Sequence, residues 1–288
     1  MKPLPAKRDL TLSYRTSLIV AALMAFASAG GLLLGSGGLY GPHPTHSLGV
    51  TEAEAGVLLP GFLGQDAFSL FVGLPLLLGS LWLARRGSLI GLLFWPGVLF
   101  YALYWYVLYL TGAPFSVLFL VYLPLVTLSA FTTISLVSSI DGEEVRRRLS
   151  DAVPARVIGA ILVVLGLLTL AQDASGALIT ALAEDAPADP AARSVWIVDL
   201  ALQAPTVIVG GVLLWHHQPL GYVAGAGLLL QYGLSAVGFV AGMVLESVLA
   251  GSPLDAATSI VLLVFGIVCC VPLAFFVRGA IAPTDGVV

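Results

Sequence analysis

The chain has 288 residues, of which 59% are hydrophobic and only 10% are charged, and its mean hydropathy is +1.02. Ordinary soluble domains carry about a quarter charged residues, so this composition indicates a protein whose solvent is lipid. The net charge is -4, and the 12 Lys and Arg residues do not provide the basic face that nucleic-acid binding requires. We therefore expect the lipid bilayer as a partner and no nucleic acid.

Eight apolar segments are each long enough to cross a bilayer, whose hydrocarbon core of about 30 Å needs about 20 helical residues. The predicted fold class is an all-α membrane protein with eight transmembrane helices. The first segment has the basic start of a signal peptide, but its apolar run is long for one, so we interpret it as a span. The expected spans are 17–36, 58–84, 88–111, 115–139, 157–182, 194–215, 220–248 and 256–277.

Lys and Arg residues occur almost entirely in alternate connections between these spans. They precede the first span, separate the second from the third and the fourth from the fifth, and follow the eighth, whereas Arg193 lies on the opposite side. Cytoplasmic loops of membrane proteins carry an excess of Lys and Arg. Both termini are therefore expected in the cytoplasm, with the chain embedded in the cell membrane.

Matching residues along the chain predict a four-span unit used twice. A constant difference in residue number aligns the second span with the sixth. A short gap is needed before the third span aligns with the seventh. We predict a first four-span repeat over 1–140, a cytoplasmic linker over 141–156 and a second repeat over 157–288. Units with an even number of spans share one orientation, as in the parallel repeats of some carriers. The matched pairs are Asp66 with Asp199, Trp82 with Trp215, Gly91 with Gly221, and Gly97 with Gly227.

Several acidic residues fall inside apolar spans. The helical rise places Asp66 about 27 Å, and Asp199 about 24 Å, from the cytoplasmic ends of their spans, and Asp173 should reach the same level. Ser69, Gly73 and Ser80 continue the face of Asp66, and Gln203 continues that of Asp199. These acids are either hydrated ends at the headgroup level or members of a shared polar cavity that binds a cation or proton. In the second interpretation, the binding residues are Asp66, Asp199, Asp173 and Gln203.

The third span is rich in aromatic residues. Tyr104 to Tyr109 approach the outer interface, where a belt of aromatic residues is expected. Tyr101 and Trp105 share a helical face and could instead line a pocket for a lipophilic or cationic ligand. Gln231 stands at the corresponding depth of the seventh span, so such a ligand pocket would differ between the halves.

Motifs that carry catalysis, metal binding or cofactor binding are missing from the sequence. Cys269 and Cys270 are adjacent within an apolar run, which fits neither a disulfide framework nor a CxxC motif. Neither GxSxG, HExxH, a phosphate-binding loop nor GxGxxG occurs in a supporting context. We expect no catalytic residues, no metal site and no cofactor, and the interpretation leans against an enzyme.

The stretches VGLPLLLGSLWLARRGSLIGLLFWPGVLFYALY and HHQPLGYVAGAGLLLQYGLS are similar to segments of multi-pass membrane proteins that are widespread in prokaryotes and uncharacterised. This resemblance covers about half of the chain. It implies a membrane location and supplies neither an activity nor site residues.

The function favoured by these patterns is a carrier for a small solute or ion, coupled to a cation or proton. Paired intramembrane acids in a duplicated bundle are its basis. A non-catalytic membrane subunit or scaffold is an alternative, and a membrane enzyme or a protein that binds a lipophilic ligand is another. The substrate, a membrane-protein partner and the oligomeric state stay open.

Overall fold

The computed structural model describes residues 4–34, 61–113, 116–183, 190–251 and 253–281, and every structural statement below refers to these residues. It contains eight helices long and apolar enough to cross a membrane, which confirms the number expected from the sequence. The first begins at Thr11, six residues before the expected start, and the expected ends at 35–36 and 58–60 lie outside the described residues. The spans are Thr11–Leu34, Gly61–Arg85, Leu89–Gly112, Phe119–Ser139, Ala155–Leu182, Ala192–Trp215, Pro219–Leu245 and Ala256–Ile281.

Two of these spans are interrupted by a π-turn. The second span contains η2 (Ser69–Gly73) followed by α3 (Leu74–Arg85). The sixth contains α8 (Pro190–Val198), η3 (Asp199–Gln203) and α9 (Ala204–Trp215). The other spans are the single helices α1 (Thr11–Leu34), α4 (Leu89–Gly112), α5 (Phe119–Ser139), α7 (Ala155–Leu182), α10 (Pro219–Ala250) and α11 (Ala256–Ile281).

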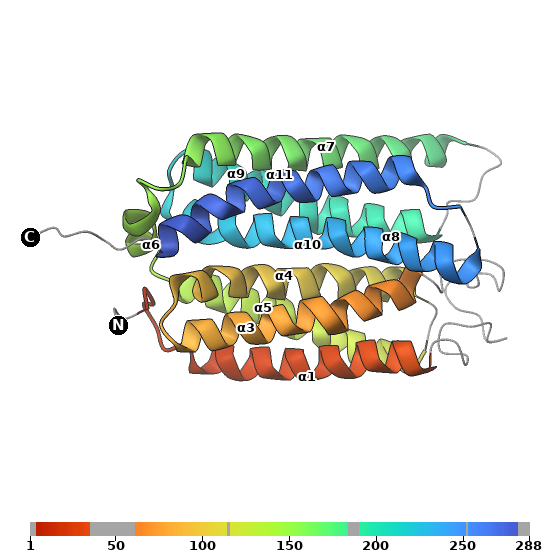
Figure 1. Ribbon diagram of the computed structural model, residues 1–288, viewed down its shortest axis with the longest axis horizontal. Coiled ribbons are helices and arrows are strands. Elements are labelled where there is room, and N and C mark those ends of the chain that lie inside the picture. The colour runs from red at the N-terminus through yellow and green to blue at the C-terminus, as the bar shows by residue number, and fades with distance from the viewer. Residues whose placement is uncertain (1–3, 35–60, 114–115, 184–189, 252, 282–288) are drawn as a thin grey trace, which may run out of the picture.

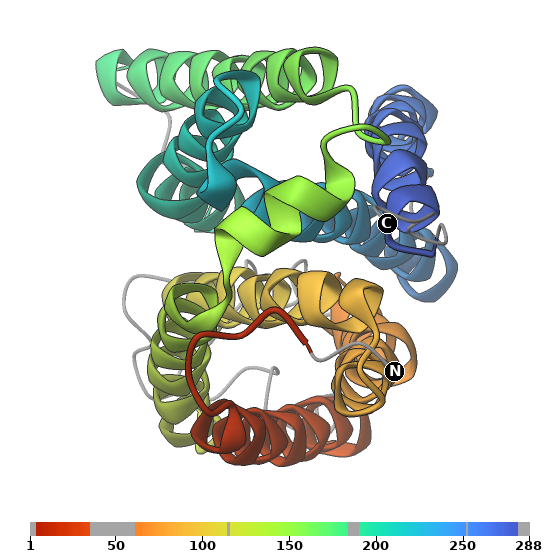
Figure 2. The same ribbon diagram turned by 90° about the vertical axis from the view of Figure 1, so that its left-hand side faces the viewer.

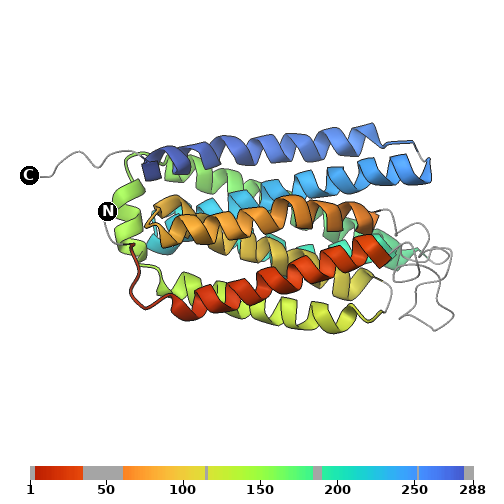
Figure 3. The same ribbon diagram turned by 60° about the horizontal axis from the view of Figure 1, so that its bottom comes forward.

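The spans lie side by side along the long axis of the molecule (Figure 1). The start of α1 and the end of α11 lie at one end of the bundle, here called the terminal end. The opposite end is called the loop end. The short helix α6 (Gly142–Leu149) lies across the terminal end, with its axis crossing those of the spans (Figure 3).

Seen along its axis, the bundle consists of two groups of spans (Figure 2). The first helix group contains α1, the second span, α4 and α5, and the second helix group contains α7, the sixth span, α10 and α11. The two groups meet where α4 packs along α10. Because α4 lies at the centre, 83% of an 18-residue apolar stretch of this helix is buried inside the protein. The corresponding share for α11 is 22%.

Close contacts between helices recur at positions separated by a constant number of residues, the number that separates Gly97 from Gly227. This separation is called the offset below. A Cβ added to Gly97 would lie 2.5 Å from the carbonyl oxygen of Gly227, and one added to Gly227 would lie 3.0 Å from the nitrogen of Gly97. The contact between α4 and α10 is thus reciprocal. Such closeness needs glycine at both positions, since a Cβ would push the backbones apart. Two other sets of close contacts are related by the same offset. Gly64 lies against Gly242 as Ser194 lies against Gly112, and Gly91 lies against Ala84 as Gly221 lies against Leu214.

The π-turns recur at this same offset, from Ser69 to Asp199, and have a local cause. In each, the residue after the turn donates its backbone N–H to the carbonyl five positions earlier, from Leu74 to Ser69 and from Ala204 to Asp199. A proline follows at once, Pro75 or Pro205, and cannot continue the helical hydrogen-bond ladder because it has no N–H. The wide turn therefore ends where the proline begins the next helix.

This offset is smaller than the one expected from the sequence for the second and sixth spans, which takes Asp66 to Asp199. In the structure, Ser69 occupies the position that corresponds to Asp199, because both residues begin the π-turn. Asp66 lies almost one turn earlier in its span. The two π-turns are therefore separated by the same number of residues as Gly97 and Gly227, and not by the number that separates Asp66 from Asp199.

The segment expected to be a linker forms α6, which is amphipathic. Asp141 caps its first turn by accepting hydrogen bonds from the backbone N–H groups of Glu143 and Glu144. Val145 and Leu149 are buried against the ends of the spans. Arg148 donates a hydrogen bond of 2.7 Å to Glu144, and this hydrogen bond lowers the pKa of that carboxyl group. The connection between the two groups is thus an ordered part of the fold.

Replacement of Gly97 by alanine is expected to destabilise the protein by about 1–3 kcal/mol, since the new methyl group would overlap the backbone of α10. Gly79→Ala is the matched control, because a Cβ there meets nothing within 4 Å and alanine favours a helix. Thermal unfolding in detergent should show a lower midpoint for Gly97→Ala alone. Equal midpoints for the two variants would contradict the close crossing of α4 and α10.

Candidate functional site

A cavity that contains two carboxyl groups lies in the second helix group. Its volume is about 260 Å³, and side chains from α7, α8, η3, α10 and α11 line it together with Tyr104 from α4. Three residues expected from the sequence to bind an ion, Asp173, Asp199 and Gln203, all line this cavity. The remaining lining residues are Leu168, Thr169, Gln172, Val195, Tyr232, Ser235, Ala236, Phe239, Met243, Thr258, Leu262 and Phe265.

Asp173 and Asp199 line the same cavity although they belong to different spans. Tyr104 from α4 lines it together with them. Two carboxylates in one cavity repel each other, which favours a proton on one of them. A carboxyl pair of this kind favours the state with one proton and one negative charge.

The negative charge of this carboxyl pair has no basic partner among the described residues. The four ion pairs found there all lie at the terminal end, within α6 or between Lys7 and Asp141. Asp173 is only 5% exposed, and neither its Oδ2 nor the Oδ1 of Asp199 has a hydrogen-bond donor in this part of the structure. Charges inside a membrane-spanning bundle are costly unless they are paired. The pair therefore has unused capacity to hold a cation or a further proton.

Amide side chains extend the polar region behind the acids. Gln231 is fully buried, and its Nε2 donates hydrogen bonds of 2.8 Å to Gln203 Oε1 and 3.1 Å to Ser235 Oγ. Its own Oε1 has no partner in the described part of the chain. Gln231, expected from the sequence to belong to a ligand pocket, therefore supports Gln203 at the edge of the acidic cavity.

The π-turn places two of these residues. Asp199 and Gln203 are the first and last residues of η3, and both line the cavity. Asp173 reaches them from α7, where Gly159 and Gly166 lie against the backbone or side chains of α9 and allow the two spans to approach closely. A π-turn often occurs at functional sites, since it redirects side chains within an otherwise regular helix.

Asp66 belongs to a separate polar cluster in the first helix group. Its Oδ1 accepts a hydrogen bond of 2.9 Å from Tyr109, and it is 1% exposed. Gln65 Nε2 donates to Tyr101 at 2.7 Å and to Ser69 at 3.1 Å. The face of Asp66 is buried as expected, but its carboxyl group is not among the residues that line the cavity. The structure thus joins Asp173, Asp199 and Gln203, and it places Asp66 elsewhere.

The aromatic residues of the third span form an interior wall, so the expected aromatic belt at the membrane surface is wrong. Tyr104, Tyr106 and Tyr109 are at most 2% exposed, because α4 lies at the centre of the bundle. Trp105 packs on Phe239 of α10 with ring centroids 4.6 Å apart, and Tyr101 lies 6.4 Å from Trp105. Neither Tyr101 nor Trp105 lines a described cavity, and their role as ligand contacts stays a prediction.

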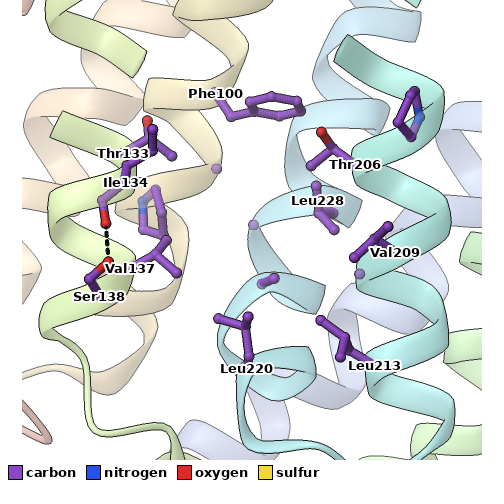
Figure 4. A pocket seen from close by; sticks show the side chains of 16 residues that line it. Phe100, Thr133, Ile134, Val137, Ser138, Thr206, Val209, Leu213, Leu220 and Leu228 are labelled. Carbon is purple, nitrogen blue, oxygen red and sulfur yellow. Dashed lines mark hydrogen bonds between the residues drawn. The ribbon is translucent and has the colours of Figure 1, made fainter. Parts of the chain in front are cut away.

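A second and larger cavity is an apolar groove between the two helix groups (Figure 4). Its volume is about 480 Å³, and Phe100, Ile134 and Val137 face Val209, Leu213, Leu220 and Leu228 across it. The hydroxyls of Thr133 and Ser138 bond to carbonyls of their own helix, so they offer little to a ligand. This surface suits a hydrocarbon chain and provides no acid, base or ion ligand.

Sequence reasoning missed several residues of the acidic cavity. Tyr104 comes from the other helix group, so no periodicity within α7 or α10 could have placed it there. Tyr232 and Thr169, which hydrogen-bond to each other, carry no motif. The π-turns did leave one signal, since Pro75 and Pro205 interrupt two apolar spans at corresponding points.

Comparison of the chain with known protein families, with curated proteins and with solved structures finds no match.

Proposed function

We propose that this protein is a membrane carrier in which the carboxyl pair of Asp173 and Asp199 binds a proton or a cation. The observation that carries the proposal is this pair itself: two acids from different spans share a cavity without a basic partner among the described residues. A purely structural role would be served better by apolar residues, because a buried charge weakens the fold unless it is compensated.

Coupling between a proton and a cation follows from the charge of the pair. With one shared proton, the pair has one negative charge, which a monovalent cation neutralises. Loss of the shared proton would leave two negative charges facing each other, and these repel at short range. Binding of one further cation would offset that repulsion. Cation uptake and proton release can thus exchange at the same two residues.

We place the terminal end in the cytoplasm of a cell that carries this protein in its cell membrane. The support is the distribution of charge: among the described residues, Arg193 alone of the Lys and Arg residues lies at the loop end. The others lie in connections or helix ends at the terminal end, as in cytoplasmic loops. The carboxyl pair would then lie in the outer half of the membrane.

We also propose that the chain consists of two tandem four-span repeats, 1–140 and 157–288, joined by the linker 141–156. The reciprocal contact of Gly97 with Gly227 and the two π-turns support a twofold relation about an axis along the membrane normal. Parallel repeats of this kind occur in carriers. The paired π-turns, each followed by proline, provide equivalent places at which both groups could bend.

Proton flux into liposomes tests the proposal. Purified protein is reconstituted with a pH-sensitive dye inside, and a potassium gradient with valinomycin sets the membrane potential. We expect flux from the wild-type protein and flux at least about tenfold lower in Asp199→Asn and Asp173→Asn, because the shared proton and the charge are lost. Asp255→Asn is the control, since Asp255 is an exposed carboxylate that caps α11 outside the cavity.

The outcomes separate the candidate functions. Flux that is lost in Asp66→Asn and retained in Asp199→Asn would overturn the assignment and move the site to the first helix group. Flux at the level of empty liposomes for the wild-type protein, with sodium and potassium chloride both tested, would favour the non-catalytic subunit or scaffold.

A further inference from the structure

The acidic cavity opens sideways, toward the surface that faces lipid. In the first helix group α1 packs along α5 and closes the ring of four spans, whereas α7 and α11, the corresponding helices, have little or no contact along their described residues. Leu168 lines the cavity although it is 52% exposed, and Gln172 and Thr258 also line it while exposed. The opening therefore lies between α7 and α11.

The walls of this cavity are mostly carbon. Tyr232 and Phe265 meet edge to face with centroids 6.4 Å apart, and Tyr104 and Phe239 meet similarly at 6.5 Å. Leucine, valine, alanine and methionine side chains add to the apolar part of the lining, and its other polar residues are Thr169, Gln172, Gln203, Ser235 and Thr258. A water molecule takes about 30 Å³ in the liquid, so about 260 Å³ has room for about nine waters or a similar number of carbon and nitrogen atoms.

We infer that the substrate of this cavity is a small organic ammonium ion with an apolar body, which enters from the bilayer between α7 and α11. The inference rests on the proposed carrier function and names the chemical class of its substrate. The ammonium group pairs with the negative charge of Asp173 and Asp199. The apolar body lies against the aromatic rings, whose faces also attract a cation.

Other ligand classes fit the same walls less well. An anion would face the carboxyl pair with no Lys or Arg among the lining residues. A bare inorganic cation would fill only a small part of the volume and would need a shell of oxygen ligands. A neutral apolar molecule would leave the charge of the pair, and the unpartnered Oδ2 of Asp173, without compensation.

Direct binding in lipid nanodiscs tests the ligand class without any gradient. Benzylammonium and benzyl alcohol, which have almost the same shape and differ in charge, are titrated by calorimetry at pH 7. We expect benzylammonium to bind at least about tenfold more tightly than the alcohol and this preference to disappear in the double variant Asp173→Asn, Asp199→Asn. The thermal midpoint of the double variant, measured in parallel, shows that it is folded.

The lateral entrance has its own test. Leu168→Trp places a bulky ring at the opening, whereas Leu178→Trp adds the same ring at a residue of α7 that is exposed and does not line the cavity. In stopped-flow measurements, we expect benzylammonium to associate about tenfold more slowly with Leu168→Trp than with Leu178→Trp, since an obstructed entrance slows entry. Equal association rates for both variants would overturn entry between α7 and α11.

Failure of this inference and failure of the proposed function give different results. Absence of benzylammonium binding, together with proton flux that depends on Asp199, would overturn the organic ligand and leave the carrier. Binding that depends on the acids, together with flux no greater than that of empty liposomes, would overturn the carrier and leave the ligand site. Displacement of bound benzylammonium by benzyl alcohol at equal concentration would overturn the role of the ammonium charge.

Discussion

Replacement of Ala236 by tryptophan is expected to abolish both benzylammonium binding and acid-dependent flux, with a loss of at least about a hundredfold. Ala236 is 4% exposed and lines the cavity from α10, between Tyr232 and Phe239. An indole ring there fills space in front of Asp173 and Asp199 that a substrate would otherwise occupy. Calorimetry in nanodiscs and flux in liposomes measure the two losses on one preparation.

The matched control for this variant is Val237→Trp. Val237 is the next residue on α10, and its side chain is 42% exposed on the outer surface. Its tryptophan adds the same bulk to the same helix without entering the cavity, so binding and flux should stay near the wild-type level. Undiminished benzylammonium binding by a folded Ala236→Trp protein would show that the ligand lies outside this cavity.

The spans could be predicted from the sequence because their signal is local. Hydropathy over about 20 residues reports the length of chain that lipid can cover, and the structure has apolar helices at all eight expected places. The start of α1 was missed by six residues because the helix continues through Arg15, which precedes the apolar run. Hydropathy alone treats such a charged residue as the edge of a span.

The register between the halves could not be read in the same way. The prediction relied on the identity of Asp66 and Asp199 and did not use Pro75 and Pro205, which follow the two π-turns. Hydropathy does not reveal a π-turn, so the turns could not guide the alignment. Residue identity therefore favoured a pairing that backbone geometry does not support.

The site was partly predictable for a similar reason. A rise of about 1.5 Å per residue put Asp173 and Asp199 at one depth, and both line one cavity in the structure. Depth alone cannot tell which way a side chain points around its helix, so it could not separate Asp66 from that pair. It also could not show that α4 would be central, which turned an expected surface belt of tyrosines into a buried wall.

Replacement of Met243 by lysine is expected to abolish benzylammonium binding and to raise the thermal midpoint by several degrees. Met243 lines the cavity from α10, and lysine has a side chain of similar length. Its ammonium group would pair with the negative charge of Asp173 and Asp199, as the substrate is proposed to do, but permanently. Acids within a membrane are stabilised by such pairing, and a site already neutralised has no affinity left for a second cation.

Val244→Lys provides the comparison, since Val244 is 44% exposed on the same helix and does not line the cavity. Its lysine can reach the membrane surface and should change neither binding nor the thermal midpoint appreciably. Combining Met243→Lys with Asp173→Asn and Asp199→Asn should reverse the gain in stability, because the ammonium would then be buried without a partner. A Met243→Lys protein that is folded and binds benzylammonium as tightly as the wild type would mean that the carboxyl pair is not where the substrate's charge is held.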